Sequence, residues 1–266
     1  MTKTVLITGA SSGIGAALAR EYAGRGARLV LLARRMALLE ALATELRAGG
    51  VTVLIGECDV TRDGEVARAV ALAQTAGGKV DVVIANAGYS VAGIFQSLTL
   101  DDYRRQFETN VFGVLRTAYE SLDGLRASGG QLVIMGSVAG HVAAPGASTY
   151  ASSKFAVRAL ADSLRADLGR EGIAVTLISP GFVDSDIRRV DNHGQLHAGA
   201  CDPIPEWLRM RVDKAARAMV AAIESRRAEV IVTLHGKLIV FFVRHFHWLV
   251  RWVAMRFVRW RKPAGS

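Results

Sequence analysis

The sequence predicts an α/β fold in which a doubly wound parallel sheet of about seven strands carries helices on both faces. Short apolar runs recur along the chain and are too continuous for strands with one face in water. Stretches with helical spacing, such as AALAREYAGRG, separate these runs. A length of 266 residues suffices for one large domain or two small ones, and 51% hydrophobic residues exclude wholesale disorder.

Seven apolar runs are expected to form the strands. The first, TVLIT at 4–8, leads directly into a glycine-rich turn and a helical pattern. The other six are RLVLLA (28–33), VTVLIG (51–56), DVVIA (81–85), QLVIMG (131–136), IAVTLIS (173–179) and EVIVT (229–233). Because no repeat, low-complexity linker or Pro-rich boundary divides them, residues 1–234 are predicted to form a single domain.

The segment 182–213 interrupts this alternation of strands and helices. It holds two prolines, two glycines and no clear period, which in a compact domain is typical of a lid or a mobile loop. We interpret it as a substrate lid. His193 and His197 stand four apart within it, but Gly194 lies between them and no third ligand is evident, so no metal site is expected.

Cysteine usage and the first residues bear on the compartment. Cys58 and Cys201 form no spaced framework, and MTKTVLITGA lacks the apolar core and cleavage site of a signal peptide. The body is therefore expected to be cytoplasmic. Its charge is close to neutral, because seven Lys or Arg and no acid between 235 and 266 account for all but +2 of the net charge of +9.

The turn TGASSGIG, residues 8–15, follows the first predicted strand. Gly9, Gly13 and Gly15 permit a tight turn and a close backbone approach, and the N-terminus of the following helix favours a pyrophosphate. Ser11 and Ser12 can add hydroxyl donors. A glycine turn alone also serves merely to connect a strand to a helix, but its place after the first strand favours dinucleotide binding.

The end of the second predicted strand indicates which dinucleotide binds. An acidic residue that contacts the ribose 2′-hydroxyl is expected there, yet position 33 is alanine and Arg34 and Arg35 follow. A guanidinium grips a 2′-phosphate with parallel hydrogen bonds, so the pair favours NADP(H) over NAD(H). The alternative is two solvated arginines at the start of the next helix.

The candidate catalytic residues follow the fifth predicted strand. Ser137 comes directly after it, and YASSK, Tyr150 to Lys154, follows thirteen residues later. On a helix this spacing puts Tyr150 and Lys154 on one face, about 6 Å apart at Cβ. An ammonium beside a phenol lowers the phenol pKa, which makes a usable general acid or base near neutral pH. Alone, Tyr-x-x-x-Lys is a common surface pattern.

Together, seven blocks match a known family in order and approximate spacing. They are TGASSGIG (8–15), CDV (58–60), NAG (86–88), Asn110, Ser137, YASSK (150–154) and PG (180–181). Over roughly residues 3 to 233 the chain resembles the short-chain dehydrogenases/reductases. The resemblance implies a Rossmann-type sheet of order 3-2-1-4-5-6-7, NADP(H) as the cofactor, and a homodimer or homotetramer assembled through the helices around 100–126 and 150–168.

The resemblance also implies residue roles. Tyr150 would protonate a carbonyl oxygen or deprotonate an alcohol, and Lys154 would lower the tyrosine pKa and bind the nicotinamide ribose. Ser137 would orient the substrate oxygen, and Asn110 would hold a water that extends the proton relay. His141 either lines the substrate pocket or is an exposed loop residue. The implied cofactor contacts are Gly9, Ser11, Ser12, Gly13, Ile14, Gly15, Arg34, Arg35, Asp59, Val60, Asn86, Ala87, Gly88, Tyr150, Lys154, Pro180, Gly181, Val183 and Ser185, with a serine at 185 where many relatives have threonine.

The last segment, 235–266, is basic and apolar at once. Four arginines between Leu238 and Trp260 make a membrane span improbable. At 100° per residue, cations including Lys237 and Arg244 fall on one side and apolar residues including Phe242 on the other, which is typical of an amphipathic helix at a membrane surface. Packing on the body or on a partner subunit is the alternative, whereas nucleic-acid binding leaves the apolar face unexplained.

These observations favour an NADP(H)-dependent oxidoreductase that reduces a ketone, or oxidises a secondary alcohol, on a hydrophobic, lipid-like substrate. The expected location is cytoplasmic and peripheral, with contact to a membrane through 235–262. Two other functions stay open: a non-catalytic NADP(H)-binding scaffold at a membrane surface, and a soluble small-carbonyl reductase whose tail is an oligomerisation helix. The intact Ser137, Tyr150 and Lys154 argue against the scaffold.

Overall fold

Seven parallel strands form one sheet in the order β3-β2-β1-β4-β5-β6-β7, which confirms the predicted fold and strand order. The computed structural model describes residues 2–75, 79–188, 192, 202, 204–246, 248 and 252. Each strand coincides with a predicted apolar run to within two residues at either end. The strands are β1 Thr4–Thr8, β2 Arg28–Ala33, β3 Val53–Glu57, β4 Val82–Ala85, β5 Gln131–Met135, β6 Ala174–Ser179 and β7 Glu229–Ile231.

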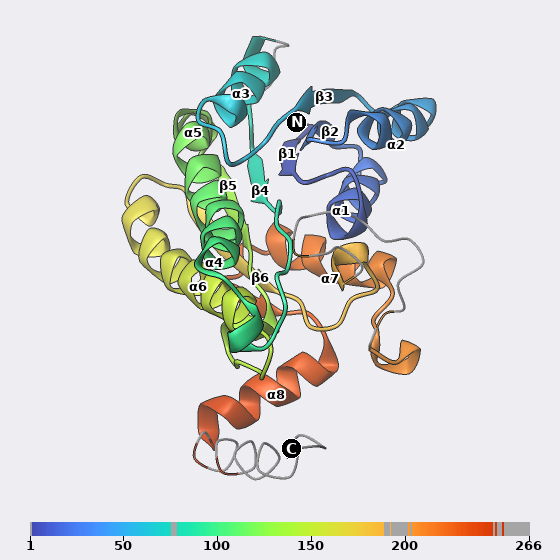
Figure 1. The fold of residues 1–266 in the computed structure, drawn as a ribbon. Coiled ribbons are helices and arrows are strands. Elements are labelled where there is room, and N and C mark those ends of the chain that lie inside the picture. Colours follow the sequence, from blue (N-terminus) through green and yellow to red (C-terminus); the bar gives the residue numbers. More distant parts are fainter. Residues whose placement is uncertain are drawn as a thin grey trace.

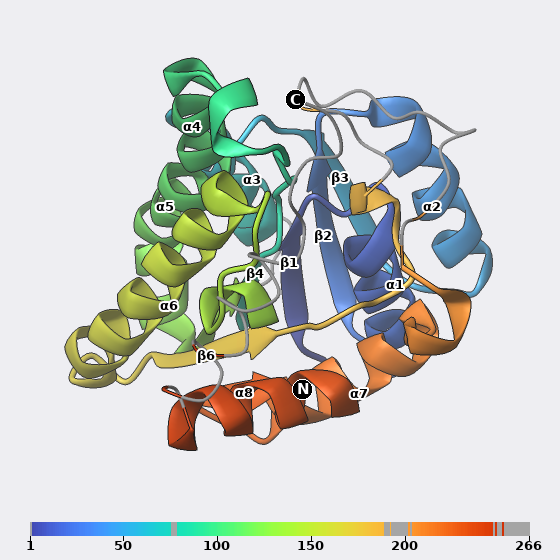
Figure 2. The ribbon, with the colours of Figure 1, turned by 60° about the horizontal axis from the view of Figure 1, so that its bottom comes forward.

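Two helical layers bury the faces of the sheet (Figures 1 and 2). Alternate residues of a strand face opposite layers: Val5 and Ile7 join the cluster with α1, α2 and α7, whereas Leu6 joins the cluster with α3, α5 and α6. The helices are α1 Gly13–Ala23, α2 Met36–Ala48, α3 Glu65–Thr75, α4 Leu100–Phe107, α5 Gly113–Ser128, α6 Ser148–Gly169, α7 Val212–Glu224 and α8 Leu234–His245.

The order of the strands determines where a ligand can bind. Because β1 lies between β2 and β4, the chain reverses its winding direction at the β1–β4 boundary. Ligands of doubly wound sheets bind beyond the carboxyl ends of the strands at such a point. The predicted site residues follow the ends of β1 to β6 and therefore gather at this edge of the sheet.

Helix α8 continues directly from β7 and lies against the body (Figure 1). Thr233 caps it by accepting a hydrogen bond from the Gly236 N–H, and Gly236 and Val240 are buried. Arg244 donates to Glu229 of β7 at 2.7 Å, so one of the arginines expected to face outward is paired within the chain. Among the described residues, no helix has the length and apolar character needed to cross a membrane.

Candidate active site

The glycine turn after β1 is shaped by close backbone contacts. Gly9 has φ +66°, and a Cβ added there would lie 2.8 Å from Cα of Ala87. Gly13 also has a positive φ, and a Cβ at Gly15 would lie 2.3 Å from the Gly9 carbonyl oxygen. Only glycine fits these positions, so the backbone passes close to β4 and leaves the N-terminus of α1 open to an anion. Ile14 is half-buried and packs on the core below the turn.

Thr8 fixes the turn to the segment after β4. Its hydroxyl oxygen accepts from the backbone N–H groups of Asn86 and Ala87, both at 3.1 Å. The Asn86 side chain donates in return to the carbonyl oxygens of Thr8 and Gly9. Gly88 follows, where a Cβ would lie 3.0 Å from Oδ1 of Asn110. The predicted residues 86–88 therefore line the cleft, and Thr8, which the sequence did not single out, holds them there.

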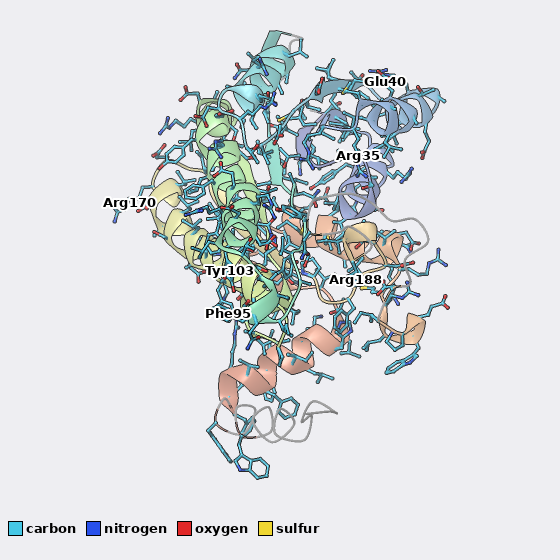
Figure 3. The ribbon with its side chains drawn as sticks, in the orientation of Figure 1. Arg35, Glu40, Phe95, Tyr103, Arg170 and Arg188 are labelled. Carbon is cyan, nitrogen blue, oxygen red and sulfur yellow. The ribbon has the colours of Figure 1, made fainter. Side chains whose placement is uncertain are left out.

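The two arginines after β2 have different surroundings. Arg35 donates to the hydroxyls of Ser11 and Ser12 at 3.1 and 2.6 Å and so lies across the glycine turn (Figure 3). Arg34 is exposed and lines a hollow of about 380 Å³. That hollow is lined by Arg34, Glu57, Asp59, Arg62, Glu65 and Arg68. Arg35 therefore lies at the glycine turn, whereas Arg34 faces the hollow after β2, among three carboxylates and two further arginines.

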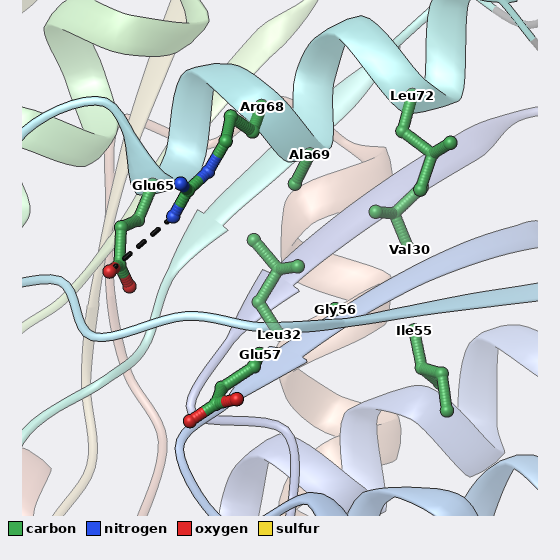
Figure 4. A pocket seen from close by; sticks show the side chains of 9 residues that line it. All are labelled: Val30, Leu32, Ile55, Gly56, Glu57, Glu65, Arg68, Ala69 and Leu72. Carbon is green, nitrogen blue, oxygen red and sulfur yellow. Dashed lines mark ion pairs between the residues drawn. The ribbon is translucent and has the colours of Figure 1, made fainter.

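Asp59 and Val60 lie beside this hollow, after β3. Asp59 Oδ1 accepts from the backbone N–H and the hydroxyl of Thr61. Burial opposes ionisation of Asp59, but these hydrogen bonds and the charge of Arg34 lower its pKa below the ordinary value. Val60 is buried. A second hollow of about 110 Å³ adjoins the first and shares Glu57, Glu65 and Arg68 with it; the other residues that line it are Val30, Leu32, Ile55, Gly56, Ala69 and Leu72 (Figure 4).

Ser137, Tyr150 and Lys154 come together where β5 ends. Ser137 begins the 3₁₀ turn Val138–Gly140, and Tyr150 and Lys154 lie in the first turns of α6. The phenol of Tyr150 is hydrogen-bonded to Ser137. The Lys154 ammonium donates to the Met135 carbonyl oxygen at 2.7 Å and lies 5.7 Å from the centroid of the Tyr150 ring. The three side chains predicted from sequence therefore share one site.

Lys154 was expected to lower the pKa of Tyr150, but the pKa of Tyr150 is raised. Burial raises the pKa of Tyr150 above 10, and the Ser137 hydrogen bond and the Arg188 charge only partly oppose this. Burial also lowers the pKa of Lys154 to about 8. The reason is geometric: the ammonium is held by the Met135 carbonyl rather than by the phenol oxygen.

Asn110 lies in a π-helical turn, Glu108–Phe112, between α4 and α5. Its side chain is fully buried, accepts from the Tyr89 N–H at 3.1 Å, and donates to the Tyr89 carbonyl and the Ser153 hydroxyl. Such turns often occur at functional sites. Asn110 thereby links the segment after β4 to the residue next to Lys154, and its role in a proton relay stays a prediction.

The segment after β6 completes the site. The Pro180 carbonyl accepts from the Val138 N–H at 2.8 Å, which holds Pro180 and Gly181 beside the 3₁₀ turn Val138–Gly140. Val183 is buried. A Cβ at Gly13 would lie 3.5 Å from Cβ of Ser185, so this serine lies next to the glycine turn, and its contact with the cofactor stays a prediction.

Arg188 is a site residue that sequence reasoning missed. Its side chain, labelled in Figure 3, donates two hydrogen bonds to Asp202, at 2.8 and 2.6 Å, and a third to the Val183 carbonyl oxygen. Its hydrogen bond lowers the pKa of Asp202 to about 2, and its charge favours ionised Tyr150. The sequence could not predict this ion pair, because Arg188 and Asp202 stand fourteen residues apart in a segment without helical or strand periodicity.

The histidines differ in outcome. His141 is not an exposed loop residue but is buried, with Nε2 3.2 Å from Glu229 and 3.3 Å from the Ser179 hydroxyl. His193 and His197 lie outside the described residues, as do residues 189–191, 194–196, 198–201 and 203 of the predicted lid. Within the part of the chain that the structure describes, no three His, Cys, Asp or Glu are grouped to hold a metal.

Comparisons with known proteins agree with this geometry. The sequence model of the family described as short chain dehydrogenase matches residues 3–196. The 11-beta-hydroxysteroid dehydrogenase A of Arachis hypogaea is 38% identical over 189 residues, which cover 70% of this chain and 54% of that protein. This chain thus spans about half the length of that relative.

Two solved structures cover nearly the whole chain. A short-chain dehydrogenase from Sphingobium yanoikuyae in complex with NADPH is 31% identical, with a TM-score of 0.76, over 99% of this chain and 98% of that one. A short-chain dehydrogenase/reductase from Burkholderia phymatum in complex with NAD is 25% identical, with a TM-score of 0.83, over 100% of this chain and 97% of that one.

Proposed function

Because this chain belongs to the short-chain dehydrogenase/reductase family of oxidoreductases, we propose that it interconverts a ketone and a secondary alcohol on a hydrophobic substrate with NADP(H). The observation that carries the proposal is the meeting of Ser137, Tyr150 and Lys154 beside the open glycine turn. When bound, the cofactor supplies or accepts the hydride. The alternative of a non-catalytic scaffold is disfavoured because all three side chains are present and grouped.

The chain's own residues handle the proton and the substrate oxygen. Ser137 and Tyr150, hydrogen-bonded to each other, present two hydroxyls to one point, which suits a carbonyl oxygen. Tyr150 gives its proton to that oxygen in reduction, and its pKa above 10 keeps it protonated near neutral pH. Burial lowers the pKa of Lys154 to about 8, and the Met135 carbonyl oxygen holds its ammonium beside the Tyr150 ring.

The preference for NADP(H) rests on the two arginines. Arg34 faces the hollow after β2, and Arg35 lies over the hydroxyls of the glycine turn, so a 2′-phosphate would meet positive charge from both. The NADPH complex of the Sphingobium protein supports this preference, whereas the NAD complex of the Burkholderia protein shows that the fold accepts either dinucleotide.

The proposal of a lipid-like substrate includes contact with a membrane through the tail, 235–266, beyond a catalytic body of residues 1–234. Leu238, Phe241 and Phe242 are about half exposed on α8, and seven cations with no acid follow His235. The name of the Arachis relative, a hydroxysteroid dehydrogenase, also favours an apolar substrate. Peripheral attachment to the cytoplasmic face of a membrane is the corresponding location.

The tail could instead form an interface between subunits, but helices α5 and α6 offer another surface for this purpose. Phe112 and Tyr119 from the α5 region and Phe155 of α6 are exposed, which supports a homodimer or homotetramer through those helices without the tail. Flotation with anionic liposomes separates the two uses. The triple variant Leu238→Ser, Phe241→Ser, Phe242→Ser should stop floating but keep its oligomeric state, whereas loss of the oligomer alone would make α8 an interface between subunits.

The test of the activity is NADPH oxidation with a panel of apolar ketones. Tyr150→Phe should reduce the rate at least about 100-fold, because it removes the acid. Tyr119→Phe is the matched control, since Tyr119 is exposed on α5, and its rate should stay within about twofold of wild type. If the wild type and both variants bind NADPH equally and none of them turns over any ketone, the result would favour the non-catalytic scaffold instead.

A further inference from the structure

The first turn of α8 touches the segment that follows β6 (Figure 1). Nε2 of His235 accepts the backbone N–H of Phe182 at 2.9 Å, and the two rings stack with centroids 5.1 Å apart. A Cβ at Gly181 would lie 2.2 Å from Oγ1 of Thr233 and 2.5 Å from Nε2 of His235. The imidazole is therefore packed directly against the Pro180–Phe182 segment.

The same turn of α8 also contacts the 3₁₀ turn Val138–Gly140. A Cβ at Gly236, next to His235, would lie 2.7 Å from Cγ2 of Val138. The Val138 N–H in turn donates to the Pro180 carbonyl, and Ser137 precedes it in the chain. One turn of α8 thus contacts both the Pro180–Phe182 segment and Val138, the residue after Ser137.

The hydrogen bond requires a neutral imidazole with its proton on Nδ1. Nε2 accepts from Phe182 and lies 3.1 Å from the Thr233 hydroxyl, which can donate to it. Among the described residues, the ring contacts Phe182, Gly181 and Thr233, none of which carries a charge. Burial lowers the pKa of His235, which keeps the accepting form at neutral pH.

We propose that His235 is a positioning residue that holds the Pro180–Phe182 segment in the geometry required for the nicotinamide end of the cofactor. The inference rests on the proposed function, because that segment is expected to contact the nicotinamide. It assigns to the tail a role in the site that is independent of any membrane: the turn after β6 has no strand partner for the Phe182 N–H, and α8 supplies the acceptor.

The experiment compares three variants of the full chain. His235→Leu removes the acceptor, and His235→Gln places a carbonyl oxygen near the position of Nε2. His245→Leu is the control, because His245 is exposed in the last turn of the same helix. Hydrogen exchange of the peptide that contains Phe182 reports the contact itself, and calorimetric titration with NADP⁺ reports its effect on the cofactor.

We expect His235→Leu to lose protection at the Phe182 amide and to bind NADP⁺ about tenfold more weakly, which corresponds to about 1.4 kcal/mol. His235→Gln should stay within about threefold of wild type, and His245→Leu should be unchanged. As the pH falls below 6.5, wild-type affinity should fall more steeply than that of His235→Gln, because only the wild type has an imidazole at position 235 that can gain a proton. This comparison needs only the Gln variant, so it holds if His235→Leu does not fold.

Four results would overturn the proposal. Unchanged protection of Phe182 in His235→Leu would show that the hydrogen bond is not formed in solution. Lost protection with unchanged NADP⁺ affinity, or identical pH dependence in wild type and His235→Gln, would make the contact purely structural. Failure of the wild type to bind NADP⁺ at all would refute the proposed function as well, and the exchange data would then still report the contact separately.

Discussion

Gly15→Ala sets two effects of opposite sign against each other. Gly15 is helical in α1, and alanine in a helix interior is ordinarily more stable than glycine by about 1 kcal/mol. Its Cβ, however, would lie 2.3 Å from the Gly9 carbonyl oxygen and 2.7 Å from Nδ2 of Asn86. The first of these atoms is backbone, so the turn or the helix must move. Overpacking of this kind costs about 1–3 kcal/mol and should outweigh the gain in helix propensity.

The net loss of about 1 kcal/mol corresponds to a fall in Tm of about 2–4 °C for a domain of this size. Thermal unfolding followed by circular dichroism measures it, and NADPH titration should show weaker binding, because the moved atoms border the expected pyrophosphate site. Gly169→Ala is the matched control: Gly169 ends α6 and a Cβ there meets nothing within 4 Å. If Gly15→Ala is as stable as Gly169→Ala, the close packing of the turn is wrong.

Three further predictions concern ionisable groups. Burial raises the pKa of Cys58 to about 12, so its thiol should resist iodoacetamide at pH 8 until the protein unfolds; rapid native labelling, read by mass spectrometry, would contradict this. The charge of Arg188 lowers the Tyr150 pKa, so Arg188→Met should raise that pKa further in an absorbance titration referenced to Tyr150→Phe, whereas Arg209→Met should not. The His141 hydrogen bond and Arg244 lower the pKa of Glu229 from 4.5 to about 2. The ionised carboxylate therefore stabilises the fold fully above pH 4.5, and this contribution is lost as the pH falls toward 2. Arg244→Met should raise the pH of acid unfolding, and the control Arg217→Met, at an exposed arginine, should leave that pH unchanged.

The sheet was predictable from the sequence because parallel strands that are buried on both faces consist of continuous apolar runs. The site was predictable to the extent that its residues directly follow strands: the glycine turn, Asn86 and Ser137 occupy the sheet edge that their positions imply.

Features that depend on the packing of distant segments were not predictable. The Tyr150 pKa rises because the phenol is buried, and no spacing rule reports burial. His141 is buried against Glu229, and Arg244 of the tail pairs with the same carboxylate, although 88 and 15 residues separate them from it. The contact between His235 and Phe182 likewise joins segments 53 residues apart.

The preference for a phosphorylated dinucleotide is the central claim, and a paired titration tests it most directly. Energy transfer from tryptophan to the bound nicotinamide gives the Kd of NADPH and of NADH for wild type, for Arg34→Ala and for the control Arg170→Ala, whose arginine lies at the far end of α6 (Figure 3). We expect NADPH to bind at least about tenfold more tightly than NADH, and this preference to disappear only in Arg34→Ala. Equal affinities for both cofactors, unchanged by the Arg34 substitution, would contradict the account.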